Sequence, residues 1–440
     1  MSCSALLKIF LLFSAICLLS IFLFVPTQKL PLLEFYDPTA LPRNKTIPNA
    51  VYWQPAIPSQ LYVHSATYAL PAENLNGYVI KVIAIVNRKD PGIHAAISCS
   101  CVCPYGTFPA LLADYPEHHG EPYTAATLTC DVRQYADFTR TIRMTLQCQM
   151  RSVSGSVELD VAPPPAVDPP ALSMAMCGPV IFGQDVRPER IVEWVEYYRI
   201  MGVSKFFIPV YYTSPFFSNV TAEVLRVLRY YEDRELVEVG NWTIPVEIER
   251  KMHYNGQLAA VNECMMKAYR YFDYVVVVDF DEYIISQHGT GLDAIVQKGS
   301  RDCVTVRHAA VKTSLSATAP PGDISQHLVR HLHRDSKIWN INERTKYICR
   351  PRCVLEAGVH FIHKSRPNTR LLVGANTEET LVLHFSEGLI GAGAPLVDVD
   401  MERFFGLARL QRLTDTVNTV YRSIFNSTGG VKYIWHKWRK

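Results

Sequence analysis

The sequence lacks any large excess of charge. Its 440 residues carry 44 lysines and arginines against 41 aspartates and glutamates, a formal net charge of +3 at pH 7. Proteins that bind nucleic acids present broad basic surfaces to the phosphates, so this balance excludes DNA and RNA as expected partners. Basic residues do gather at 327–334 and 436–440, and we interpret these as solvated faces. The three histidines of the first cluster lack the fourth ligand of a zinc site.

Familiar hydrolase and nucleotide-binding motifs are missing as well. The chain has no G-x-S-x-G, H-E-x-x-H or G-x-x-x-x-G-K-[ST] pattern, so nothing supports a serine hydrolase, a zinc peptidase or a P-loop enzyme. It also lacks the paired C-x-x-C knuckles of structural zinc sites. A hydrolase with a lumenal metal site is therefore only a third interpretation, which predicts release of free sugar or phosphate without an acceptor.

The chain does contain an even number of cysteines beyond its N-terminal segment. Even numbers are typical of disulfides formed in an oxidising lumen, although the sequence leaves their connectivity open. The crowded Cys99-x-Cys101-x-Cys103 is compatible with a metal thiolate cluster, but we expect disulfides. The ten cysteines are Cys99, Cys101, Cys103, Cys130, Cys148, Cys177, Cys264, Cys303, Cys349 and Cys353.

The N-terminal segment is strongly apolar. An unbroken run occupies residues 9–25, and residues 5–7 extend it to about the twenty residues that a bilayer span needs. We predict an uncleaved membrane anchor; a cleaved signal peptide is the alternative, but no small-x-small cleavage site follows. Sequons are glycosylated only in the lumen, so their presence predicts a single-pass type II protein. The four sequons begin at Asn44, Asn219, Asn241 and Asn426.

Composition divides the chain into five segments. Residues 1–26 are predicted to be a cytoplasmic tail and anchor, and residues 27–60 a proline-rich stem. Residues 61–161 hold short β-rich runs and most of the clustered cysteines, which predicts a small sandwich-like domain. Residues 162–171 form a polyproline linker that no helix or central strand can contain. Residues 172–440 begin with alternating strands and helices, which predicts a mostly parallel, Rossmann-like sheet.

The most informative segment is an apolar run at 274–278 that ends in Asp279, Asp281 and Glu282. A strand without polar alternation is typical of a buried parallel sheet, and ligands bind at the carboxyl edge of such sheets. In an extended strand Asp279 and Asp281 would project to one side, where two oxygen donors suit Mg²⁺ or Mn²⁺. A solvated turn is the alternative for an isolated Asp-x-Asp. We rank Glu282 first as a partner that orients the ligands.

Several blocks of the chain resemble glycosyltransferase family 92 in order and spacing, and the match covers residues 176–385. The blocks are residues 191–203, 257–264, 279–284, and 346–351 with 358–360. The resemblance implies a GT-A fold, a nucleotide-sugar donor, a divalent metal and inversion at the anomeric carbon. Because characterised members resemble galactosyltransferases acting on fucose of N-glycans, it also implies UDP-galactose, a glycoprotein glycan and the Golgi lumen.

The resemblance assigns metal binding and catalysis to Asp279 and Asp281. Enzymes with a GT-A fold commonly complete the metal shell with a histidine near the C-terminal end of the fold. His384, in a predicted strand, is the first choice for that ligand and His360 the second. The alternative for either histidine is an ordinary place in the core.

Nucleotide contacts and the catalytic base are less defined. The turn after the first strand faces the same crevice, so Asp185, Arg187 and Arg190 are candidates for the nucleotide, with helix capping and surface pairing as the alternative. An inverting transfer needs a carboxylate base, and Glu343 is the first choice. Trp339 would stack an acceptor sugar or serve as a buried anchor. The other carboxylates downstream are Asp335, Glu378 and Glu379.

Together these features predict a glycosyltransferase that uses Mn²⁺ or Mg²⁺ and a UDP-sugar donor and is anchored in the membrane. The alternative is a non-catalytic glycan-binding or scaffold protein that keeps the fold, against which the intact Asp279 and Asp281 argue. A homo-oligomer is compatible with the sequence. The donor sugar, the acceptor, the linkage and the base stay open.

Overall fold

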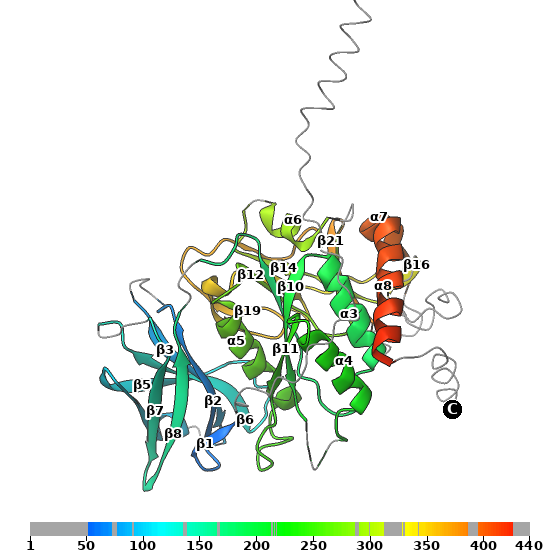
Figure 1. Ribbon diagram of the computed structural model, residues 1–440. Helices are drawn as coiled ribbons and strands as arrows, with labels where there is room; N and C mark the ends of the chain where they lie inside the picture. Colours follow the sequence, from blue (N-terminus) through cyan, green and yellow to red (C-terminus); the bar gives the residue numbers. More distant parts are fainter. Residues whose placement is uncertain are drawn as a thin grey trace, which may run out of the picture. The chain divides into compact units, whose positions relative to one another are not determined.

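The computed structural model describes most of residues 52–425 and contains two groups of strands (Figure 1). Residues 1–51 and 426–440 lie outside the described residues, as do 73–76, 90–91, 135–138, 165–167, 213, 215, 217, 287–289, 299, 312–327, 329–330, 342 and 386–394. The predicted anchor and most of the predicted stem therefore fall outside the described residues. In the part that is described, no helix combines the length and the apolarity needed to span a bilayer.

The first group of strands forms a closed barrel. Its hydrogen-bonded order is β1-β2-β3-β6-β5-β4-β7-β8, and a pairing of Ala66 with Val161 joins β2 to β8. The strands are β1 Gln54–Ile57, β2 Leu61–Ala69, β3 Val79–Asn87, β4 Ile97–Cys103, β5 Gly106–Asp114, β6 Tyr123–Asp131, β7 Ile142–Met150 and β8 Val153–Ala162, with the short helix α2 Ile93–Ala96 before β4. β1 comes from the range predicted for the stem.

The prediction of a sandwich-like domain was wrong, because the first and last long strands pair and close the sheet. Alternation predicted the strands correctly: in β7, Ile142, Met144 and Leu146 point into the interior while the residues between them face outward. Sandwiches and barrels share this alternation. Closure depends on a pairing across about ninety residues of sequence, for which the chain gives no local signal.

The second group centres on a seven-stranded sheet of order β11-β10-β9-β12-β17-β14-β20. The strands from β11 to β12 are parallel, whereas β17 runs antiparallel to both β12 and β14. The strands are β9 Met174–Cys177, β10 Val203–Val210, β11 Val237–Asn241, β12 Tyr274–Val277, β14 Cys303–Val306, β17 Lys346–Cys349 and β20 Leu371–Leu372.

The prediction of a mostly parallel, Rossmann-like sheet was therefore wrong. Antiparallel pairing does not require a crossover helix, and β17 pairs antiparallel with both of its neighbours. Three small sheets belong to this second half of the chain. They are β13 Glu282–Ser286 with β21 Thr380–His384 and β15 His308–Ala310, β16 His331–Asp335 with β22 Leu396–Asp400, and β18 Val354–Ala357 with β19 Ile362–Ser365.

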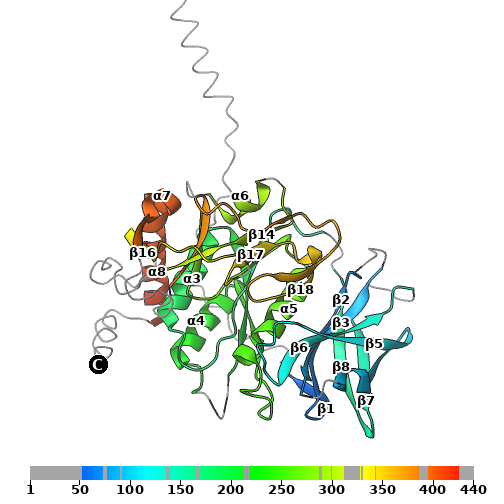
Figure 2. The same ribbon diagram turned by 180° about the vertical axis from the view of Figure 1, so that it is seen from behind.

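Helices cover both faces of the seven-stranded sheet. α3, α4 and α8 pack together over one face, and α5 packs on the other, where Figure 2 shows β18 beside it. The helices are α3 Pro188–Ile200, α4 Ala222–Glu232, α5 Gln257–Ala268, α6 Leu292–Gln297, α7 Met401–Phe405 and α8 Leu407–Phe425, with the 3-10 turns η1 His253–Gly256 and η4 Pro351–Cys353.

The barrel packs on α5, and all described residues lie in one compact unit. β3 is apolar on both faces because Ile80 and Val82 line the barrel interior while Ile83 and Ile85 pack in the cluster that includes α5. A buried contact of 3.0 Å joins His64 Nδ1 of β2 to Glu263 Oε1 of α5.

Four disulfides connect the described cysteines, in agreement with the predicted oxidised state. They are Cys99–Cys148, Cys101–Cys130, Cys177–Cys264 and Cys303–Cys349, and Cys103 and Cys353 are free.

We predict that replacing Cys177 and Cys264 together by serine lowers the free energy of unfolding by about 2–5 kcal/mol, because this bridge ties β9 to α5 across a long loop. Urea unfolding measures the change. The matched control is Cys103→Ser, which removes a half-buried free thiol and should have a much smaller effect. Equal unfolding midpoints for the double variant and the wild type would refute the bridge.

Candidate active site

The candidate site lies where β12 ends. β12 is fully buried and pairs with β9 on one side and β17 on the other. Asp279 and Asp281 follow in a turn, and β13 starts at Glu282. The two aspartates thus do not share one strand face as predicted. They reach the same region from a turn, at the carboxyl edge of the parallel strands.

A buried lysine holds the turn together. Lys346 is the first residue of β17, and its Nζ lies 2.6 Å from Asp279 Oδ2 and 3.1 Å from Glu282 Oε2. The side chains of Lys346 and Glu282 are both 0% exposed. Burial opposes the charge of Lys346, but the two carboxylates outweigh it and keep the lysine pKa above its ordinary value. Similarly, burial acts to raise the pKa of Asp279, but Lys346 outweighs it and the pKa is lowered.

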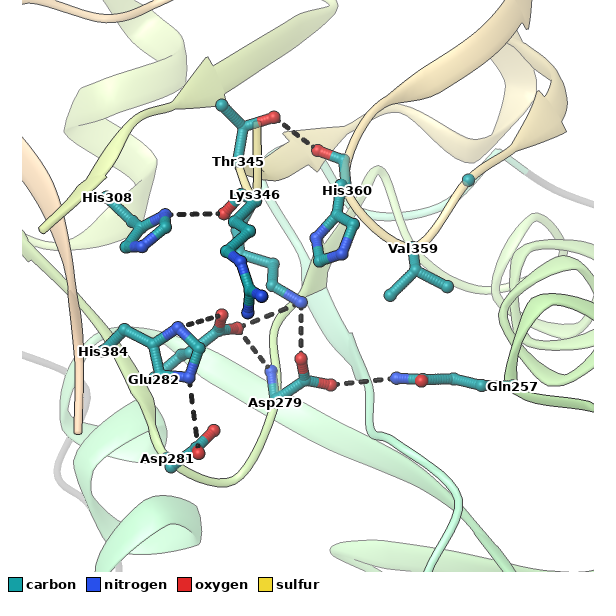
Figure 3. A network of polar contacts seen from close by, with 12 residues as sticks. Gln257, Asp279, Asp281, Glu282, His308, Thr345, Lys346, Val359, His360 and His384 are labelled. Carbon is teal, nitrogen blue, oxygen red and sulfur yellow. Dashed lines mark hydrogen bonds and ion pairs between the residues drawn. The ribbon is translucent and has the colours of Figure 1, made fainter. Parts of the chain in front are cut away.

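Asp279 has further fixed partners. Gln257 Nε2, from the start of α5, donates to Asp279 Oδ1 at 2.9 Å. The indole of Trp194 in α3 donates to the Asp279 carbonyl at 2.9 Å, and the Asp279 backbone N–H donates to Glu282 Oε2 at 2.8 Å. Side chains from α3, α5 and β17 therefore fix the orientation of this single residue, and Figure 3 shows those of Gln257 and Lys346 directed at it.

Asp281 lies opposite a histidine. The antiparallel register of β13 and β21 pairs Glu282 with His384, which places the imidazole between two carboxylates. His384 Nε2 lies 3.4 Å from Asp281 Oδ2, and its Nδ1 lies 3.4 Å from Glu282 Oε1. Burial opposes protonation of His384, but the hydrogen bond to Asp281 and the charge of Glu282 raise its pKa overall. Gln257 and His384 approach the aspartates from opposite sides in Figure 3.

These groups fit a divalent cation in charge and donor type. Three carboxylates lie together, of which two pair with Lys346 and the third, Asp281, pairs with His384. Both nitrogens of His384 face carboxylate oxygens, and the facing atoms His384 Nδ1 and Glu282 Oε1 are buried without hydrogen bonds that satisfy them. On the other side of the ring, His384 Nε2 and Asp281 Oδ2 are the imidazole and carboxylate donors that would suit Mn²⁺ or Mg²⁺. Asp279 would share its carboxylate with Lys346. Among the described residues, no ready-formed group of three metal ligands occurs.

Two further histidines border this cluster. His308 of β15 is stacked on Trp339 at 5.2 Å, and its Nδ1 is 3.0 Å from the Arg344 carbonyl. Burial lowers the pKa of His308 to about 3, assisted by His384. His360 is held through its carbonyl, which accepts a hydrogen bond of 2.6 Å from Thr345, and burial lowers its pKa to about 4. Both rings are therefore neutral at pH 7.

Comparison with known families identifies the chain. The model of glycosyltransferase family 92 matches residues 173–404, which is more than half of the sequence. The chain belongs to glycosyltransferase family 92. The resemblance seen in its separated sequence blocks is confirmed, and the matched region contains every residue of the Asp279 cluster.

Curated relatives are distant, and each matches over only part of its length. Beta-1,4-galactosyltransferase galt-1 of Caenorhabditis elegans is 23% identical over 58% of this chain and 58% of its own length. Galactan beta-1,4-galactosyltransferase GALS1 of Arabidopsis thaliana is 26% identical over 46% of this chain and 41% of its own length. The chain thus spans less than two thirds of either relative. Among solved structures, Cwp6 from Clostridium difficile covers 51% of this chain and 46% of its own at 8% identity, and its TM-score of 0.18 carries no argument.

In this family-92 chain the residues predicted for the nucleotide lie between β9 and α3. Asp185 does not cap α3, because Arg187 occupies the N-cap position and its side chain makes no capping bond. Arg187 is exposed and lies 3.7 Å from Glu189. Arg190 is half-buried in the first turn of α3. Within the described part of the chain, no hydrogen bond or ion pair joins Asp185 or Arg187 to the Asp279 cluster.

The residue predicted as the base lies on a loop. Glu343 is exposed, and its carboxylate accepts a hydrogen bond of 3.3 Å from Asn340. Asp335 is buried and accepts a hydrogen bond from the Lys337 backbone, so its carboxylate already has a partner at the end of its own strand. The structure therefore leaves the choice of Glu343 as a prediction.

Sequence reasoning gave no role to three residues of the cluster. Lys346 and Gln257 lie inside blocks that carried the family resemblance, and a lysine at the head of the apolar strand 346–349 was the available signal. A lysine in such a strand is expected to have a buried acidic partner. His308 had no comparable signal, because its contact with the cluster depends on the pairing of β15 with β21.

We predict that Lys346→Met lowers the free energy of unfolding by about 3–5 kcal/mol, because it leaves two carboxylates buried without a counter-charge. Adding Glu282→Gln should recover part of the loss, which a double-mutant cycle in urea measures. The control is Lys364→Met, which breaks an exposed ion pair and should cost less than about 1 kcal/mol. A Lys346→Met variant as stable as that control would contradict the assignment.

Proposed function

We propose that this chain is a metal-dependent, inverting galactosyltransferase that moves galactose from UDP-galactose to a hydroxyl group of a glycoprotein glycan. The observation that supports it most is the Asp279, Asp281 and His384 cluster at the carboxyl end of β12 in a family-92 chain. The printed names of two relatives, both galactosyltransferases, support the choice of sugar.

The proposed reaction is a direct displacement. The acceptor oxygen forms a bond to the anomeric carbon as the bond from that carbon to the β-phosphate oxygen of UDP breaks. The acceptor hydroxyl loses its proton to a base, and UDP leaves with the electron pair of the broken bond. Inversion follows because attack and departure take place on opposite faces of the sugar.

Asp281 and His384, with Asp279 as a shared ligand, would hold the divalent cation. When bound, such a cation stabilises the charge that develops on the leaving diphosphate. Lys346 keeps Asp279 ionised, and Gln257 fixes its orientation, so the carboxylate is ready without rearrangement. Glu282 orients His384 through Nδ1, as carboxylates do for many histidine ligands.

The nucleotide and the base are assigned more coarsely. The three candidate nucleotide residues follow β9, which is the parallel neighbour of β12; they are Asp185, Arg187 and Arg190. The segment that carries them therefore leaves the sheet at the same edge as the segment that carries Asp279. Arginine forks suit diphosphate oxygens, which supports a contact to UDP. Glu343 precedes β17 on an exposed loop, where its carboxylate has access to an acceptor hydroxyl.

We also propose that the chain folds in the lumen of the secretory pathway, because four disulfides such as these form and persist in an oxidising compartment. This compartment supplies glycoprotein glycans as acceptors. A non-catalytic glycan-binding protein is the second candidate, and it shares the fold but transfers no sugar.

We predict that Asp281→Asn abolishes Mn²⁺-dependent hexose transfer while leaving secretion and the melting temperature close to wild type. Its side chain is 28% exposed and is not part of the core, so folding does not depend on its charge. Mass spectrometry of mixed N-glycan acceptors, incubated with UDP- and GDP-sugars and Mn²⁺, measures transfer.

The control is Asp415→Asn on the exposed side of α8, which should transfer normally. Transfer by Asp281→Asn at the wild-type rate would remove the metal assignment. A folded wild-type protein that binds glycan but transfers no sugar from any donor would favour the non-catalytic candidate.

The two described sequons make a further prediction. Asn219 is exposed, whereas Asn241 is half-buried and its side chain accepts a hydrogen bond from the Thr243 backbone. In secreted protein from eukaryotic cells, Asn219→Gln should increase gel mobility more than Asn241→Gln. If neither change alters mobility, and glycosidase treatment also has no effect, the lumenal assignment is wrong.

A further inference from the structure

A short segment beside the candidate site has an unusual backbone. Tyr254, Asn255 and Gly256 have successive φ values of 39°, 50° and 79°, all in the left-handed region. Residues with a Cβ rarely adopt that conformation, and strained backbone of this kind persists only where the surroundings impose it. Such strain gathers at sites where a side chain has to be presented in a fixed direction.

The packing around this segment imposes its conformation. Asn255 is buried, and its carbonyl accepts a hydrogen bond of 3.1 Å from the buried Trp242 indole. Gly256 has no room for a side chain, since an added Cβ would lie 3.1 Å from Met252 Cε and 3.4 Å from Trp242 Nε1. Tyr254 is the exception, because it is 60% exposed. The fold thus fixes the backbone firmly and places a large aromatic side chain in solvent.

Tyr254 ends a row of three aromatic rings. His253 lies 4.5 Å from Tyr254 with the ring planes at 88°, and His119 of the barrel stacks on His253 at 3.7 Å. His119 also has positive φ and a side chain that is 43% exposed. The row therefore joins the barrel loop between β5 and β6 to the segment before α5.

The segment that carries the row runs directly into a residue of the Asp279 cluster. Gly256 is the N-cap of α5, and the next residue is Gln257, whose side chain holds Asp279. The same barrel loop also reaches the hairpin between β18 and β19, because Glu117 Oε2 accepts hydrogen bonds of 3.0 Å from the Val359 backbone and from His363. That hairpin carries His360, which Figure 3 shows beside the Lys346 amine.

We propose that His119, His253 and Tyr254 form an acceptor subsite, in which the exposed face of Tyr254 stacks on a pyranose ring of the glycan. Sugar rings present C–H groups on one face and hydroxyls at the edge, which suits an aromatic face bordered by imidazole nitrogens. The proposed nucleotide contacts lie after β9, so the row at the start of α5 is left for the acceptor. The assignment rests on the proposed transferase function.

The test is acceptor binding by the full chain, with Tyr254→Ala compared with Tyr254→Phe. Saturation-transfer NMR with β-1,4-galactotetraose and with a fucosylated N-glycan detects weak binding without catalysis. Tyr254→Ala should weaken binding of the recognised probe about tenfold, while Tyr254→Phe, which keeps the ring, should change it less than about threefold. The matched control is Tyr271→Ala, an equally exposed tyrosine just beyond the other end of α5, which should bind normally.

Kinetics and stability separate this inference from the proposed function. Where the wild type transfers sugar, Tyr254→Ala should raise the KM for acceptor and leave the KM for UDP-galactose unchanged. Tyr254→Gly should lose acceptor binding yet melt no lower than the wild type, because glycine tolerates the left-handed backbone.

Three results would overturn the subsite. These are equal binding by the wild type and Tyr254→Ala, absence of binding of both probes by the wild type, and an increase in the KM for donor instead of acceptor. A wild type that binds a probe through Tyr254 but transfers no sugar would keep the subsite and reject the transferase.

Discussion

The Lys346 ammonium group is the interaction on which the site depends. Three carboxylates lie within residues 279–282, just after β12, and they would repel strongly in a region of low dielectric constant. Lys346 is fully buried against two of them and lies on the strand that pairs antiparallel with β12. β17, which reverses the strand direction, therefore brings Lys346 to the sheet edge. The charge of Lys346 lets the acidic turn form there.

This neutralisation is incomplete. Lys346 pairs with two of the three carboxylates, and the third, Asp281, lies opposite His384, whose other nitrogen faces Glu282. The arrangement is rigid because Trp194 and Gln257 hold Asp279 from two different helices. A fixed acidic cluster of this kind is compatible with the cation-assisted transfer that we propose for this family-92 chain.

α5 couples the barrel to this chemistry. Its first residue, Gln257, holds Asp279, and farther along the helix its buried Glu263 contacts His64 of the barrel. β3 is apolar on both faces because one face lines the barrel and the other packs in the cluster around α5. The barrel loop that carries Glu117 and His119 reaches both the segment before α5 and the hairpin tip that holds His360. The barrel is thus part of the surroundings of the site.

The sequence by itself determined many of the strands and helices up to β12, the acidic segment after β12 and the family, because these depend on local periodicity and on short motifs. The family resemblance also indicated His384. Only the tertiary structure decided that the barrel closes, that β17 reverses the sheet, and that Lys346, Gln257 and His308 meet Asp279 and His384. Those outcomes depend on pairings between residues tens of positions apart, and the energy of such contacts leaves no periodic trace in the chain.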